Sequence, residues 1–139
     1  MNKVLLLAGY LNALVATLHL GCIVYGAPWY RFFGAGEQMA IWAVQGNIKA
    51  TLYTLFIATV LFTWSAYAFS GAGTISRLPW LKVILVTITS VYILRGVAGF
   101  FLINNPLGRT AEFWLWSSII CLGFGIVHLV GLKQVWSNI

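Results

Sequence analysis

An arginine stands inside an apolar stretch of this sequence, in the segment Ile93-Leu94-Arg95-Gly96-Val97-Ala98-Gly99. Its guanidinium group presents a planar fork of N–H donors that matches a carboxylate or a phosphate. A charged side chain at the centre of a membrane-spanning helix costs about 2.5–3.5 kcal/mol on insertion scales, and such residues usually face a bundle interior or a wet cavity. Arg95 is therefore the first candidate for binding an acidic ligand.

A second ionisable residue is predicted at the same depth. His19 and Arg95 each lie fifteen residues into an apolar run that starts on the same side, which places both roughly 22 Å from that side. A histidine exchanges a proton near neutral pH. The sequence predicts an outward-facing polar pocket that binds or transports a small amphiphile, a lipid or an anion. The remaining members of the predicted ligand-binding set are Lys49, Glu37, Tyr53 and Tyr92.

Two readings without a ligand stay open for the arginine. Arg95 lies only about 8 Å from the nearer membrane edge by helix rise, so its long side chain can reach the interface. It can also form a fixed ion pair with Glu37, the acid expected near its side.

The sequence predicts no catalytic residues, no metal ligands and no cofactor. It contains no aspartate, no pair of carboxylates within one apolar run, and neither a CxxC nor an HxxxH motif. His19 and His128 are predicted to differ in depth by roughly 14 Å. Because metal–nitrogen bonds are about 2 Å long, the two histidines cannot share one metal ion or one haem within a chain.

Composition assigns these residues to an all-α polytopic membrane protein. The chain is 61% hydrophobic and 7% charged, whereas a soluble domain carries about a quarter charged residues. Its apolar residues form four runs near the ~20 residues that cross a bilayer, and they do not alternate as barrel strands would. We therefore predict one domain, residues 1–139, that is a bundle of four transmembrane helices. The runs are Val4–Gly26, Ala50–Ser70, Trp80–Ile103 and Phe113–Leu132.

The first loop, residues 27–47, is long and apolar, and we predict that it is an amphipathic outer segment. Pro28 is predicted to end the first helix, and Glu37 to open a helical stretch because a negative charge suits a helix N-terminus. The segment either lies on the membrane surface or covers a pocket as a lid. Small residues on the long helices, such as Gly96, Gly99 and Gly125, are predicted to mark where helices meet.

Orientation and partners follow from the charges. Lysine and arginine in the short loops slightly favour cytoplasmic N- and C-termini. The net charge of +6 lies at the predicted interfaces and suits membrane lipids, and it gives no reason to expect nucleic acid. The apolar surface of four helices predicts a homo-oligomer or a partner membrane protein.

Two family comparisons bear on location and function. Residues 26–40, "GAPWYRFFGAGEQMA", resemble segments of small bacterial membrane proteins, a resemblance that implies no particular activity. We expect the protein to lie in a bacterial inner membrane. Small multidrug transporters are similar only in length and span count, because their first span carries a glutamate where this chain has His19. Two functional alternatives to ligand binding remain open: an accessory or assembly subunit, and a small quinone- or haem-linked enzyme.

Overall fold

The computed structural model describes residues 1–33, 36–105 and 109–139, and their regular structure is helical. Four of the helices are long and apolar enough to cross a membrane, which confirms the predicted all-α membrane fold. Each begins and ends within three residues of a predicted run. The four are α1 (Lys3–Tyr25), α4 (Ile48–Ala72), α5 (Leu81–Phe101) and α6 (Ala111–Val135).

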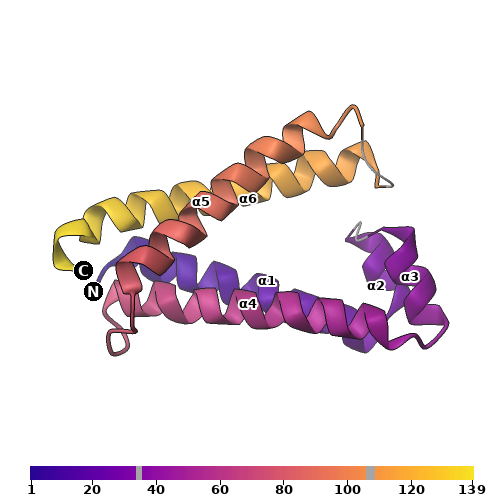
Figure 1. Ribbon diagram of the computed structural model, residues 1–139, viewed down its shortest axis with the longest axis horizontal. Coiled ribbons are helices and arrows are strands. Elements are labelled where there is room, and N and C mark those ends of the chain that lie inside the picture. Colours follow the sequence, from indigo (N-terminus) through magenta and orange to yellow (C-terminus); the bar gives the residue numbers. More distant parts are fainter. Residues whose placement is uncertain (34–35, 106–108) are drawn as a thin grey trace.

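The four long helices form two antiparallel pairs, α1 with α4 and α5 with α6 (Figure 1). The pairs meet at the end of the molecule that holds both chain termini, which we call the converging end. They separate toward the other end, which we call the diverging end. Contacts between the pairs run mainly from α1 to α6 and from α4 to α5.

Polar caps fix where the long helices begin. The Asn2 side chain accepts a hydrogen bond of 2.8 Å from the backbone N–H of Leu5 at the start of α1. Thr110 does the same for Phe113 at the start of α6, at 3.0 Å. At the C-terminal end of α4, Gly73 adopts the left-handed conformation with φ of 87°, which a glycine reaches without steric cost.

Small residues let α5 and α6 approach closely, as the sequence predicted. Gly96, Gly99 and Gly125 are all buried. A Cβ added at Gly125 would lie 3.1 Å from the backbone nitrogen of Ile93, and one at Gly96 would lie 2.9 Å from the backbone nitrogen of Leu122. Van der Waals contact through such positions is what holds helices together in lipid.

The first loop contains two short helices at the diverging end, α2 (Ala27–Phe32) and α3 (Glu37–Val44) (Figure 1). Glu37 opens α3, as predicted. Pro28 does not end α1. The helix ends at Tyr25, where the next residue, Gly26, has a φ of 76° that breaks it, and Pro28 lies in the first turn of α2. The amphipathic character of the loop stays a prediction. A last 3-10 turn, η1 (Trp136–Asn138), follows α6.

Candidate functional site

Arg95 lies on α5 and points its guanidinium group at α6. Its Nη2 donates a hydrogen bond of 3.1 Å to the hydroxyl of Ser117. Its guanidinium carbon lies 4.8 Å from the centroid of the Trp114 ring, an arrangement in which the electron-rich face of the indole attracts the cation. The side chain therefore does more than extend along the lipid-facing surface, because two residues of the neighbouring helix hold it.

Two buried polar atoms beside this contact lack a hydrogen-bond partner in the described part of the chain. They are Nη1 of Arg95 and Oγ of Ser118. Both lie against the bare backbone of Gly99: a Cβ there would collide with Ser118 Oγ and would lie 2.7 Å from Arg95 Nη1. An unsatisfied buried donor costs about 1–3 kcal/mol, so this spot is a place where an added acceptor would be stabilised.

A second arginine approaches the same tryptophan. The guanidinium carbon of Arg109 lies 5.9 Å from the Trp114 ring centroid and 5.3 Å from that of Phe113. A Cβ at Gly36, directly before α3, would be 3.8 Å from Arg109 Nε, so the first loop reaches the start of α6. We call Arg95, Arg109, Trp114, Ser117 and Ser118 the arginine–tryptophan cluster.

Glu37 does not neutralise Arg95 in this structure. Its carboxylate forms an exposed ion pair with Arg31, with Arg31 Nη2 2.9 Å from Glu37 Oε1. The hydrogen bond and the charge of Arg31 lower the pKa of the Glu37 carboxyl. The predicted alternative of a fixed Glu37–Arg95 pair is therefore wrong, because Glu37 is engaged within the first loop.

The other predicted residues at the diverging end lie on the α1–α4 side. His19 Nδ1 is 2.8 Å from the carbonyl oxygen of Val15 in its own helix. Lys49 Nζ lies 5.6 Å from the Trp42 ring centroid, and the Tyr53 ring lies 5.9 Å from the same ring. The structure thus shows no hydrogen bond or ion pair that joins these three to Arg95 among the described residues. Their part in ligand binding stays a prediction.

Tyr92 joins a different group, a buried network that links the two helix pairs. Its hydroxyl donates a hydrogen bond of 2.5 Å to Asn12 Oδ1 on α1. The Asn12 Nδ2 lies 3.0 Å from His128 Nε2 on α6, and the rings of Tyr92 and His128 stack at 5.5 Å. We call Asn12, Tyr92 and His128 the buried network.

The direction of these bonds indicates which ring nitrogen of a neutral His128 carries the hydrogen. Because Asn12 accepts from Tyr92 through Oδ1, its amide nitrogen donates, and His128 Nε2 must accept. A neutral ring then carries its hydrogen on Nδ1, and this buried atom has no partner among the described residues. His128 is only 1% exposed.

Sequence reasoning missed the buried network as a unit. It grouped Tyr92 with Arg95 in the predicted ligand-binding set, and Asn12 was not among the candidate residues. Asn12 is the tenth residue of α1 and Tyr92 the twelfth of α5, so both lie near the middle of a span. The shared depth of these two residues could have been predicted from the sequence. The direction in which each side chain faces could not.

Two cavities in the described part of the chain include none of the six residues predicted to bind a ligand. One of about 420 Å³ lies between α1, α2, α3 and α4 and is lined in part by Ile23, Tyr30 and Ala50. The other, of about 450 Å³, lies at the converging end and is described below. The arginine–tryptophan cluster is a half-buried contact site on and beside α5 and α6, and its residues line neither of these two cavities.

Within residues 1–33, 36–105 and 109–139, no three histidine, cysteine or acidic side chains gather as metal ligands would. Comparisons with protein-family models, with curated proteins and with solved structures find no match to this chain. The function proposed below therefore depends on the geometry of the chain's own residues.

Proposed function

We propose that this integral membrane protein binds, and as a carrier moves, a small amphiphile or anion whose acidic head contacts Arg95. The observation that supports the proposal is an arginine inside a membrane span with no acidic partner among the described residues and with one buried N–H group unused. Its present contacts are a neutral hydroxyl and an aromatic ring. They orient the cation without neutralising it.

The surroundings of Arg95 suit a head group with an attached chain. A carboxylate or phosphate oxygen can accept from the guanidinium fork and from the Ser118 hydroxyl, which is also without a partner in the described residues. One turn away on the same face of α5, Val91 is 41% exposed. An acyl or ring tail can therefore lie along apolar surface while the head stays at Arg95.

The proposal includes an orientation. We propose a bacterial inner membrane, with the converging end and both termini in the cytoplasm and the arginine–tryptophan cluster toward the outside. The support is the bias of lysine and arginine toward cytoplasmic loops. Lys3, Arg77, Lys82 and Lys133 lie at or near the converging end.

Replacing Arg95 tests the proposal. The Arg95→Met variant keeps an unbranched apolar stem and removes the charge, and Arg95→Lys keeps the charge and removes the planar fork of donors. The probes are oleate and oleyl alcohol, which share a chain and differ in the charge of the head. Binding is measured from the shift in thermal stability of purified full-length protein as each probe is titrated.

We expect the parent protein to bind oleate at least about tenfold more tightly than oleyl alcohol, since a hydrogen bond to a charged group contributes about 1.5–3 kcal/mol. Arg95→Met should remove this preference, and Arg95→Lys should keep part of it. Arg31→Met is the matched control, because it removes one positive charge from the same end without touching the cluster. Equal preference for oleate in the parent and in Arg95→Met would overturn the proposal.

A further inference from the structure

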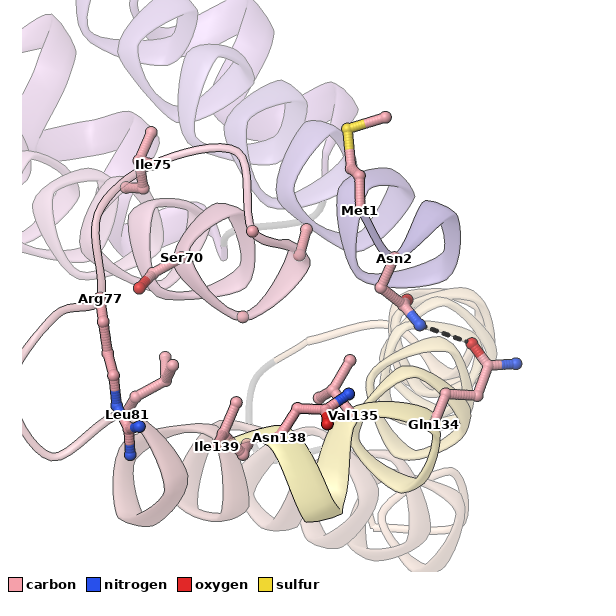
Figure 2. Close-up of a pocket in the computed structure, with 13 residues that line it drawn as sticks. Met1, Asn2, Ser70, Ile75, Arg77, Leu81, Gln134, Val135, Asn138 and Ile139 are labelled. Carbon is pink, nitrogen blue, oxygen red and sulfur yellow. Dashed lines mark hydrogen bonds between the residues drawn. The ribbon is translucent and has the colours of Figure 1, made fainter.

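The cavity at the converging end is bounded by all four long helices or their ends. Its volume is about 450 Å³, large enough for a lipid head group. Figure 2 shows Arg77 and Leu81 on one side of it and Asn2 and Gln134 on the other. Its polar lining residues are Asn2, Ser70, Arg77, Gln134 and Asn138.

Hydrogen bonds hold the polar rim of this cavity in place. Asn2 Nδ2 donates to Gln134 Oε1 at 2.8 Å, which ties the start of α1 to the end of α6. The Ser70 hydroxyl donates to the carbonyl of Ser76 at 3.0 Å and accepts from the backbone N–H of Leu78 at 2.9 Å. These last two bonds fix the loop that carries Arg77, so the arginine is presented at the mouth by an anchored backbone.

One basic residue lines the cavity, and three others are sequence neighbours of lining residues. Arg77 lines it, and three lysines stand next to lining residues: Lys3 follows Asn2, Lys82 follows Leu81, and Lys133 precedes Gln134. The Lys82 ammonium group lies over the ring of Trp136, with Nζ 4.3 Å from the ring centroid.

The two acidic residues of the sequence are elsewhere. Glu37 begins α3 and Glu112 lies in the first turn of α6, both at the diverging end. The converging end therefore carries four cationic side chains and no acidic side chain to neutralise them.

We propose that this cavity binds a phosphate group, carried by an anionic phospholipid. Arg77 and the side-chain amides of the lining supply donors for phosphate oxygens. Apolar side chains line the same cavity, among them Ile75, Leu81 and Val135, and the exposed apolar surface of the helices continues from it. A ligand with a phosphate at one end and acyl chains at the other contacts both the polar and the apolar residues of the cavity. A free phosphate contacts only the polar residues. This site is separate from Arg95 and does not depend on the function proposed above.

The test uses full-length protein in nanodiscs of phosphatidylcholine with a minor fraction of phosphatidylglycerol. Native mass spectrometry counts the phosphatidylglycerol molecules that stay bound. Arg77→Gln should lower retention at least about tenfold, because it removes a charge-assisted hydrogen bond from a lining residue to the phosphate. Arg77→Lys should change it less than twofold. Lys133→Gln is the matched control, since it removes an exposed charge of the same end that does not line the cavity, and it should also change retention less than twofold.

Three results would overturn the proposal. Unchanged retention in Arg77→Gln would exclude the cavity. Equal losses in Arg77→Gln and Lys133→Gln would show diffuse attraction to the charged surface. Displacement of the lipid by millimolar inorganic phosphate would assign the site to a free phosphate compound. Arg95→Met should retain phosphatidylglycerol as the parent does, so failure of this proposal and failure of the Arg95 proposal are distinguishable.

Discussion

Replacing Asn12 by leucine should destabilise the protein more than replacing any other member of the buried network. The leucine has a similar volume but can neither accept from Tyr92 nor donate to His128. It leaves a hydroxyl and a ring nitrogen buried without partners. Interhelical hydrogen bonds in membranes average about 0.6 kcal/mol and reach about 1.7 kcal/mol, so we expect the two losses to lower the free energy of unfolding by roughly 2 kcal/mol.

A double-mutant cycle gives the sharper result. Tyr92→Phe alone should cost about 1 kcal/mol, because it leaves Asn12 Oδ1 unpaired. In the Asn12→Leu background the same change removes a hydroxyl that is already unsatisfied. It should then cost nothing or be slightly stabilising, which is a coupling energy of about 1 kcal/mol.

The assay is reversible unfolding in mixed micelles, followed by circular dichroism. Thr59→Val is the control, since Thr59 is exposed and its hydroxyl donates to the Leu55 carbonyl of its own helix. It should change stability by less than about 0.5 kcal/mol. Additive effects of Asn12→Leu and Tyr92→Phe, or an Asn12→Leu protein as stable as the control, would refute the buried network as a link between the helix pairs.

Three further predictions concern packing, the first loop and orientation. Gly99→Ala should cost about 1–3 kcal/mol in thermal or denaturant unfolding because its methyl group meets a buried hydroxyl, whereas Gly123→Ala, with open space around it, should be neutral or stabilising; equal effects would contradict the close contact. The Glu37 carboxyl should titrate below its ordinary pKa of 4.5 in an NMR experiment, since Arg31 lowers that pKa. The ion pair then stabilises the first loop at pH values above the ordinary pKa of Glu37, and this stabilisation is lost as the pH falls through the lowered pKa. Arg31→Gln should return the pKa of Glu37 to its ordinary value. An unchanged pKa of Glu37 in this variant would contradict the ion pair. A cysteine placed at Ser76, in the loop between α4 and α5, should react with an impermeant reagent only after the membrane is opened, and labelling in intact cells would reverse the proposed orientation.

The fold was predictable because length and apolarity decide which segments cross a bilayer. Each predicted run begins and ends within three residues of the ends of a long helix. Gly96, Gly99 and Gly125 lie where α5 and α6 touch, as is typical of small residues on membrane helices. The end of α1 was less predictable. A proline at position 28 suggested the break there, but the backbone turns two residues earlier at Gly26, and proline is tolerated in the first turn of the next helix.

The candidate site was predictable only along the helix axes. Counting residues gave Arg95 and His19 a common depth, yet they lie on different helix pairs that separate toward the diverging end (Figure 1). The sequence also grouped Tyr92 with Arg95 in one ligand-binding set, whereas the Tyr92 hydroxyl faces Asn12 on another helix. The direction in which a helix face points depends on how the helices pack against each other. A helix that is apolar on all sides carries little of that information in its sequence.

An experimental density map of the protein, purified with native lipids, tests the central claim most directly. We expect density for an anionic head group within hydrogen-bond distance of Arg95 Nη1 and Ser118 Oγ, two of the three buried side-chain atoms that lack partners among the described residues. The attached tail should follow the exposed surface of α5 near Val91. A map in which Arg95 Nη1 and Ser118 Oγ bond only to each other, to backbone carbonyls or to water would contradict the proposed ligand site.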